Sequence, residues 1–275
     1  MTWTDASIWG LDEVGLRIAV FTTFFSALAV LELLHPRLDR PELMRALKAR
    51  RWFTNLSLLL VSSLILRIAF PAAATGVALF AQANGYGFLP RSGLPPFLAG
   101  LLAFVILDFA IWLEHLVFHQ VPLFWRIHRV HHADTGLDLT TGLRFHPLEI
   151  LVSMLWKSAV ILALGAPVAS VLVFEIVLNG AAMFNHANLK LPAGADRLLR
   201  WLIVTPDMHS IHHSAEPAET DSNYGFNLSI WDRLFSTYRA RTKQAPEDVR
   251  IGLAQDETAH PSRLFWSLLL PLRRR

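Results

Sequence analysis

The chain contains no cysteine. Disulfides, thiolate metal ligands and a cysteine nucleophile are therefore excluded, and any bound metal must be held by nitrogen or oxygen. Charge is also scarce, because Asp, Glu, Lys and Arg make up only 17% of the residues, against about a quarter in an ordinary soluble domain. Together with a hydrophobic content of 53%, the low charge indicates a membrane protein.

Three apolar runs are long enough to cross a bilayer, which takes about 20 helical residues. They are residues 14–34, 53–81 and 95–113. A fourth run, 150–184, is too long for one span and contains Gly165 and Pro167, which break a helix, so a tight helical hairpin is predicted there. Strand signals are confined to short runs. The predicted fold is all-α, an integral membrane helical bundle of about four or five membrane helices with a cytoplasmic, histidine-rich helical cap.

The orientation of the bundle follows from charge. Lysines and arginines, Arg40 among them, concentrate in residues 37–51, whereas the N-terminal tail carries Asp5, Asp12 and Glu13. Because positive loops stay in the cytoplasm, the 37–51 loop is predicted to lie inside. Counting spans then places the histidine cluster of this multi-pass protein on the cytoplasmic side. The N-terminus lacks the features of a signal peptide, and we expect the first span to be retained.

Histidines recur at helical spacing. The segment "HRVHH" at 128–132 places three histidines at i, i+3 and i+4, and "HSIHH" at 209–213 repeats the spacing. Residues three and four apart share one face of a helix, so each triplet can converge on one side. His115 and His119 in "EHLVFH" share a face in the same way. Unpaired, these eight imidazoles would cost about 1–3 kcal/mol per group, whereas metal coordination would make the cluster stabilising.

The number of histidines indicates two metal ions. A catalytic zinc site takes three protein ligands and a structural site four, so eight or nine histidines suit two ions with positions left open for water or oxygen. Imidazole binds iron, zinc, copper and nickel alike, so ligand type does not name the metal. His35 and His260 have no partner at helical spacing and are expected to be ordinary polar side chains.

The order HxxxH, HxxHH and HxxHH after membrane spans resembles the fatty acid hydroxylase and sterol desaturase superfamily of integral-membrane di-iron oxygenases. The matching segments are "DFAIWLEHLVFH" at 108–119, "FWRIHRVHH" at 124–132, "RFHPLE" at 144–149, "VTPDMHSIHH" at 204–213 and "DSNYGFNLSIWDRLFSTY" at 221–238. The last segment is most similar to the alkylglycerol monooxygenase-like and bacterial sterol desaturase family branch. On this basis, N-terminal membrane helices occupy 1–103, a histidine-box catalytic region occupies 104–240, and a C-terminal tail occupies 241–275, within one structural domain.

The resemblance implies two iron ions, with zinc as a substitute metal. The ligands it implies are His115, His119, His128, His131, His132, His209, His212 and His213, with His186 as a ninth. Some members carry another histidine four residues after the ninth, where this chain has Lys190. His146 is a weaker candidate, because Pro147 follows it and it could equally cap a helix.

Metal-bound histidines usually donate their other ring nitrogen to a carboxylate or carbonyl. The carboxylates available in this part of the sequence are Asp108, Glu114, Asp134, Asp138, Glu149 and Asp207. We take Asp108, Glu114 and Asp207 as the leading candidates for this supporting role. Asp108 stands inside an otherwise apolar span, where a charge is expensive and usually functional. No catalytic group beyond the metal ligands is predicted.

The reaction implied by the family is hydroxylation or desaturation of a C–H bond in a lipid such as a fatty acyl, ether-lipid or sterol-like molecule. It uses dioxygen and external electrons. No GxGxxG fingerprint for a flavin or nicotinamide follows a strand. The electrons are therefore expected from a separate donor, such as a reductase with cytochrome b5, a ferredoxin or a pterin-type donor.

Two other classes of protein remain as alternatives, a membrane metal-dependent hydrolase and a non-catalytic metal-binding or transport protein. A hydrolase needs a general base beside its metal, as the glutamate of HExxH provides, and the sequence has no HExxH. A transporter needs polar residues along several spans, whereas here they gather at one membrane face. Nucleic acid is not an expected partner, because no basic face or motif for it is present.

Overall fold

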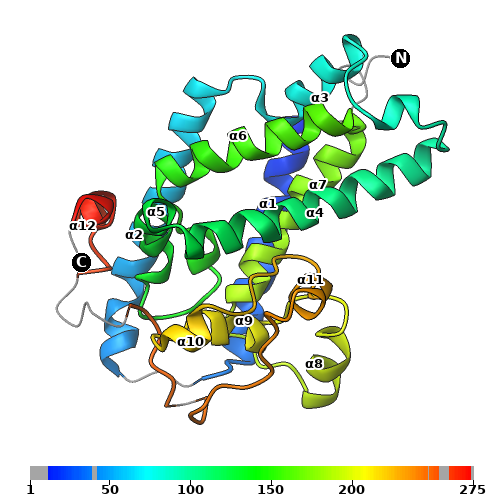
Figure 1. Ribbon diagram of the computed structural model, residues 1–275. Coiled ribbons are helices and arrows are strands. Elements are labelled where there is room, and N and C mark those ends of the chain that lie inside the picture. The colour runs from blue at the N-terminus through cyan, green and yellow to red at the C-terminus, as the bar shows by residue number, and fades with distance from the viewer. Residues whose placement is uncertain (1–11, 39–41, 247, 254–259, 274–275) are drawn as a thin grey trace.

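The computed structural model describes residues 12–38, 42–246, 248–253 and 260–273 (Figure 1). Within these residues the regular elements are helices, and strand pairing is limited to isolated bridges. The prediction of an all-α fold is therefore confirmed. Asp5 and Arg40, which contributed to the predicted orientation, lie outside the described residues.

Five helical segments in the described residues are long and apolar enough to cross a membrane. The helices that form them are α1 (Glu13–Leu34), α2 (Glu42–Ala69) continuing into α3 (Ala73–Ala83), α4 (Pro96–Gln120), α6 (Pro147–Leu164) and α7 (Val168–His186). The chain is thus a multi-pass membrane protein, as predicted. An apolar core joins α3, α4, α6 and α7 through side chains such as Ala78, Leu107 and Phe174.

The second apolar run forms one candidate span, Lys48–Ala83, but is divided into two helices. Helix α2 ends at Ala69, and α3 begins at Ala73. Pro71 stands between them and supplies the physical reason, because proline has no N–H to donate and disfavours the helical conformation of the residue before it. The break shows how a proline inside a hydrophobic run divides a helix without ending the run.

The predicted hairpin between residues 150 and 184 is present. Gly165 ends α6 in the left-handed conformation, with φ of 63°, and Pro167 precedes α7. A Cβ on Gly165 would lie 2.3 Å from the Tyr86 carbonyl oxygen. Glycine is therefore required here by both the backbone angle and the space.

Short helices gather at one end of the bundle and form the cap (Figure 1). They include α5 (Pro122–His132), α8 (Ala193–Leu199), α9 (Pro206–His212), α10 (Pro217–Thr220) and α11 (Ile230–Leu234). Helix α12 (Leu264–Leu269) packs against α2. Helix α4 runs to Gln120, so its last turns bring His115 and His119 to α5 and α9. The cap is therefore built directly on the ends of the membrane helices.

Candidate metal centre

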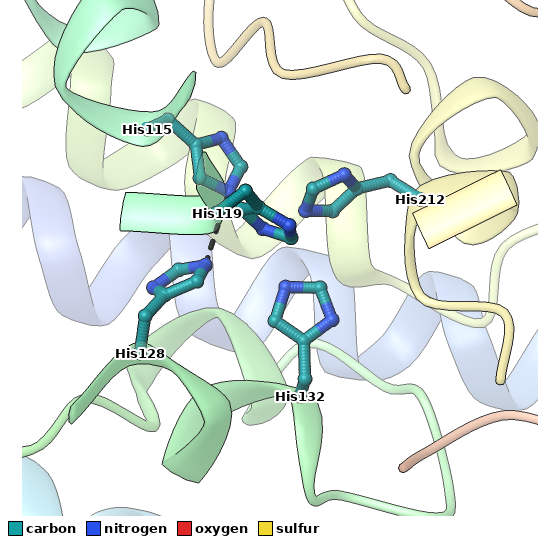
Figure 2. A group of neighbouring side chains, drawn as sticks. All are labelled: His115, His119, His128, His132 and His212. Carbon is teal, nitrogen blue, oxygen red and sulfur yellow. Dashed lines mark hydrogen bonds between the residues drawn. The ribbon is translucent and has the colours of Figure 1, made fainter. Parts of the chain in front are cut away.

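Nine histidines form two compact groups in which the candidate ligand atoms all lie within 4.8 Å of one another. The first group, shown in Figure 2, consists of His115, His119, His128, His132 and His212. The second consists of His131, His186, His209 and His213. These are the eight spaced histidines and the ninth candidate predicted from the sequence. The structure therefore brings together every histidine of the predicted ligand set except His146.

Each histidine triplet divides between the two groups. On α5, His128 and His132 belong to the first group and His131 to the second. In the segment of α9, His212 belongs to the first group, whereas His209 and His213 belong to the second. Consecutive residues of a helix point in directions about 100° apart. One short helix can therefore serve two adjacent sites.

In the first group, backbone carbonyls fix the orientation of two rings. The Nδ1 atom of His115 lies 2.7 Å from the Tyr224 carbonyl oxygen, and that of His212 lies 2.7 Å from the Ser222 carbonyl oxygen. A carbonyl only accepts hydrogen bonds, so each Nδ1 must carry the proton. In a neutral ring the lone pair is then on Nε2, the nitrogen available to a metal.

Carboxylates hold two other rings of the same group. The Nδ1 of His128 lies 2.6 Å from Glu149 Oε1, and the Nδ1 of His119 lies 3.3 Å from Asp221 Oδ1. The Nε2 atoms of His128 and His115 face each other at 3.1 Å. Both are lone-pair nitrogens when the rings are neutral and the carboxylate ionised, so they cannot hydrogen-bond to each other. A cation between them would satisfy both.

The second group converges on His186. Its Nε2 lies 3.0 Å from the Nε2 of His131, 3.0 Å from that of His213 and 3.1 Å from that of His209. The Nδ1 of His186 donates to the Ala182 carbonyl oxygen at 2.5 Å, and that of His131 lies 3.2 Å from the Arg144 carbonyl oxygen. The inward nitrogens of His186 and His131 are therefore lone pairs that face each other, as in the first group.

Burial keeps these rings uncharged. It lowers the pKa of His128 to about 3 and, together with the neighbouring imidazoles, lowers the pKa values of His131, His132, His209 and His213 well below 6.5. Neutral imidazole is the form that binds metals.

Three inward nitrogens of the first group are left without a hydrogen-bond partner. These are the Nε2 atoms of His119, His132 and His212. An unsatisfied buried polar group costs about 1–3 kcal/mol, and a metal ion would remove that cost. The residues present thus fit two cations with nitrogen ligands, a donor set suited to iron, zinc, copper or nickel.

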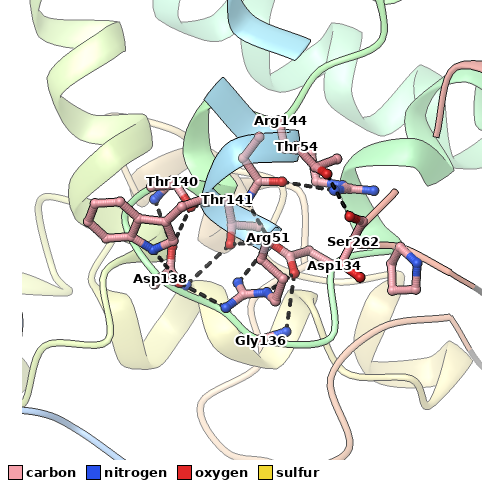
Figure 3. Close-up of polar contacts among 12 residues, drawn as sticks. Arg51, Thr54, Asp134, Gly136, Asp138, Thr140, Thr141, Arg144 and Ser262 are labelled. Atoms are coloured by element: carbon pink, nitrogen blue, oxygen red, sulfur yellow. Dashed lines mark hydrogen bonds and ion pairs between the residues drawn. The ribbon is translucent and has the colours of Figure 1, made fainter. Parts of the chain in front are cut away.

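A buried ionic network fixes the segment that follows α5 (Figure 3). Arg51 of α2 donates to Asp134 at 2.6 Å and to Asp138 at 2.9 Å. Arg144, which is fully buried, donates to the Val130 carbonyl oxygen at 2.7 Å, while its own carbonyl oxygen lies beside His131. Although burial alone would raise it, the Arg51 charge holds the pKa of Asp134 well below its ordinary value. The network therefore anchors the α5 histidines to the membrane helices.

The three carboxylates taken as leading candidates make their contacts elsewhere. Asp108 accepts from the Trp231 indole at 2.7 Å, Glu114 accepts from Ser153 at 3.1 Å, and Asp207 pairs with Arg37. Their positions on the helices explain this. Asp108 precedes His115 by about two turns, or roughly 10 Å, and Glu114 points about 100° away from the neighbouring His115.

His146 lies in neither group. Its Nδ1 accepts from the Leu148 N–H at 3.2 Å and caps α6, and its Nε2 lies 3.2 Å from the Leu268 carbonyl oxygen. Both ring nitrogens are thus engaged with the protein, as the capping alternative anticipated. We therefore assign His146 to the cap of α6 and not to a metal.

The sequence reasoning missed most of the groups that support the rings. Glu149 was among the available carboxylates without being singled out. Asp221 and the carbonyls of Ser222 and Tyr224 belong to the segment "DSNYG", for which no contact was predicted. The available signal was an acidic turn soon after the last histidine triplet.

Residues 100–237, half of the chain, match the family model described as fatty acid hydroxylase. The chain belongs to the fatty acid hydroxylase family. The superfamily predicted from the histidine motifs is therefore confirmed. Relatives named as an ornithine lipid hydroxylase and as alkylglycerol monooxygenases support the predicted branch.

Relatives bear names of lipid enzymes. The chain is 30% identical over 183 residues to the ornithine lipid hydroxylase OlsE of Rhizobium tropici, covering 66% of this chain and 54% of that protein. It is 34% identical over 138 residues to the alkylglycerol monooxygenase of Xenopus tropicalis, covering 50% of this chain and 30% of that protein. It is 26% identical over 169 residues to the fatty acid hydroxylase vlmA of a Lecanicillium species, covering 54% and 44%. The matches thus span about half, or less, of these relatives' lengths. No solved structure matches.

Proposed function

We propose that this protein is a membrane di-iron oxygenase that hydroxylates, or desaturates, a C–H bond of a membrane lipid. The observation that carries the proposal is the pair of buried imidazole groups, five and four in number, at the end of a membrane bundle in a fatty acid hydroxylase family chain. The relatives' names, which specify ornithine lipid, alkylglycerol and fatty acid, support a lipid as the substrate.

Nine histidines would hold the metals. One ion would be bound by His115, His119, His128, His132 and His212, and the other by His131, His186, His209 and His213. Bound iron would supply reductive activation of dioxygen and abstraction of hydrogen from an unactivated C–H bond. Zinc could take the same ligands as a substitute metal.

The protein's own groups prepare the ligands. Glu149 and the Tyr224 and Ser222 carbonyls accept the Nδ1 protons, which fixes the tautomers that leave Nε2 free. Such contacts orient metal ligands and raise their basicity. The burial of the rings excludes bulk water from the space between them.

The hydrolase alternative is less favoured by the geometry. Glu149, the carboxylate closest to a ring of the first group, contacts the Nδ1 of His128, on the side of the ring away from the converging Nε2 atoms. A general base would have to reach a water on the metal side. Glu149 therefore suits ligand orientation better than proton abstraction.

Metal analysis of protein purified without oxygen tests the metal assignment. About two irons per chain are expected, and a single zinc would contradict it. Lipid extracts of cells with and without the protein, grown under labelled dioxygen, test the reaction. One labelled oxygen atom in a lipid supports hydroxylation, loss of two hydrogens without label supports desaturation, and a hydrolysed ester would instead support the hydrolase.

Residues 37–51, predicted as a loop, are mostly the first turns of α2, which begins at Glu42. Their Lys/Arg bias favours a cytoplasmic cap, and the electrons would come from a separate donor of the cytochrome b5, ferredoxin or pterin type. A reporter fused after Tyr238 should give a cytoplasmic signal. A signal from the opposite compartment would reverse the orientation.

A further inference from the structure

A cavity of about 650 Å³ lies between α1, α2 and α7. Its walls are mainly apolar and include Phe21, Phe24 and Leu59. Two other lining residues, Ile18 and Leu60, are 61% and 69% exposed on helices that can cross the membrane. Their exposed surface faces lipid, so the cavity is accessible sideways from the hydrocarbon of the bilayer.

The depth of the cavity matches one leaflet. It follows α7 from Ile176 to Asn185, which is about 14 Å at the rise of an α-helix. The hydrocarbon core of a bilayer is about 30 Å thick. Asn185 stands at the cap end of the span and Ile176 near its middle. A lipid in this leaflet would therefore have its polar group near Asn185 and its chain along α7.

Two buried asparagines supply unpaired acceptors at the cap end. Asn185 is 0% exposed, and its Nδ2 donates to the Phe226 carbonyl oxygen at 2.7 Å, which leaves its Oδ1 without a donor. Asn227 is 5% exposed and its side chain lies against the Asp108 carboxylate; neither its Oδ1 nor its Nδ2 makes a hydrogen bond of good geometry. With Nδ2 on the side of the carboxylate, Oδ1 is the atom left for a ligand. Both residues line the cavity. The pair would accept hydrogen bonds from a ligand that carries hydroxyl or amide N–H groups.

The same end adjoins both histidine groups. Asn185 directly precedes His186, and the Asn227 carbonyl accepts from Val204 at 3.0 Å, just before α9 begins. Phe226 precedes Asn227 in the chain, and its carbonyl oxygen accepts from Asn185. Its ring lies 5.0 Å from the ring of His115 and 6.2 Å from that of His209, centroid to centroid. A lipid held by the asparagines would thus lie next to the candidate metal-binding histidines.

Farther from the cap, the polar residues that line the cavity are Asn179, which is exposed, Ser63 and Arg17. Arg17 lines the cavity there, but it pairs with Glu13 and with Glu175, each at 2.9 Å, and Lys157 pairs with Glu175 at 3.0 Å. The charges of this cluster balance. An anionic headgroup would therefore find no unpaired positive charge in this cluster.

We infer that this cavity binds the lipid substrate, with its alkyl chain along α7 and a hydrogen-bond donor of its polar part on Asn185 and Asn227. The inference rests on the proposed function and defines the substrate class as a single-chain segment joined to a hydroxyl or amide N–H group. A glycerol hydroxyl and an amide N–H would meet the asparagines in the same way.

Photoreactive lipids test the site without requiring turnover. The probes share one alkyl chain bearing a diazirine and carry a glycerol group, an N-acyl amide group, or a glycerol group whose hydroxyls are methylated. The full-length protein in bilayer vesicles is expected to be labelled within residues 176–185, with a donor-bearing probe preferred over the methylated one by about five-fold or more. Preference for glycerol or for amide identifies the source of the donor. Equal labelling by donor-bearing and methylated probes would overturn the role of the asparagines.

Two variants locate the chain and the donor. Gly180 lines the cavity, and the nearest atom to a Cβ there is Phe24 Cε1 at 3.5 Å. Gly180→Phe should therefore obstruct the cavity beside Phe24 and reduce labelling at least ten-fold. Val173→Phe, on an exposed position of α7 outside the cavity, is the matched control and should not reduce it. Asn185→Leu should reduce the preference for donor-bearing probes, because only the Asn227 acceptor remains.

The outcomes separate this inference from the proposed function. Labelling at 176–185 that Gly180→Phe abolishes supports the cavity even if no labelled oxygen enters a lipid, in which case the oxygenase proposal fails alone. Labelling elsewhere, or labelling that Gly180→Phe does not change, overturns the cavity even if oxygenation is found. Retention of the probe preference in Asn185→Leu would also count against the assigned acceptors.

Discussion

Replacement of Glu149 should weaken one metal site and spare the other. Its Oε1 lies 2.6 Å from His128 Nδ1, and the residue is 3% exposed, so the contact is shielded from bulk water. Loss of a carboxylate that supports a metal-binding histidine typically costs 10–100-fold in metal affinity, or about 1.4–2.7 kcal/mol. Glu149→Gln keeps an acceptor oxygen and belongs at the lower limit, whereas Glu149→Leu removes it and belongs at the upper limit.

The assay is metal content after equilibration with a graded series of chelator concentrations. In the Glu149 variants, the metal of the first group should be released at a lower chelator concentration than in the wild type, because Glu149 contacts His128 of that group. The metal of the second group should be released at the wild-type concentration. Glu114→Gln is the matched control, since Glu114 is also buried but bonds to Ser153. Equal weakening of both metals, or a Glu149→Leu variant that behaves as the Glu114 control, would refute the reasoning.

Three other outcomes are expected. His146→Ala should keep full metal content and lose about 1 kcal/mol of stability, because it removes a helix cap; loss of metal on analysis would return His146 to the ligand set. Arg51→Met should cost about 3–5 kcal/mol in denaturant unfolding in detergent, because it leaves the buried Asp134 charge without its partner. Adding Asp134→Leu should recover part of that loss, and no recovery would argue against the ion pair as the cause. Metal-free protein should lose stability as the pH falls below about 6.5: burial lowers the pKa values of cap histidines such as His131 and His209, so the unfolded chain binds more protons there. Melting temperatures that stay constant from pH 7 to pH 5 would contradict this.

Local patterns in the sequence were enough for the helical part of the fold. Apolar runs of membrane length predicted the bundle, because a bilayer forces backbone groups to bond within their own helix. Gly165 and Pro167 predicted the hairpin, because their backbone preferences are properties of the residues themselves. Pro71 carries the same kind of information, and it indicates the break between α2 and α3.

The candidate ligands were also visible in the sequence. Helical spacing places residues three and four apart on one face, and this property needs no tertiary contact. It brought out the eight spaced histidines. His186 lacks a spaced partner and was found only through the family resemblance, and the structure brings it among His131, His209 and His213.

The tertiary structure alone decided how these residues are divided and supported. Whether His131 joins His128 or His186 depends on where the last residue of α7 lies beside α5. The partner of His128 depends on how α6 packs, since Glu149 is 21 residues away along the chain. The cavity beside Asn185 likewise forms only where α1, α2 and α7 meet. Sequence periodicity fixes the face on which a side chain lies, because the helix is a local structure. The neighbour that the face meets is set by packing between distant segments, which no local pattern encodes.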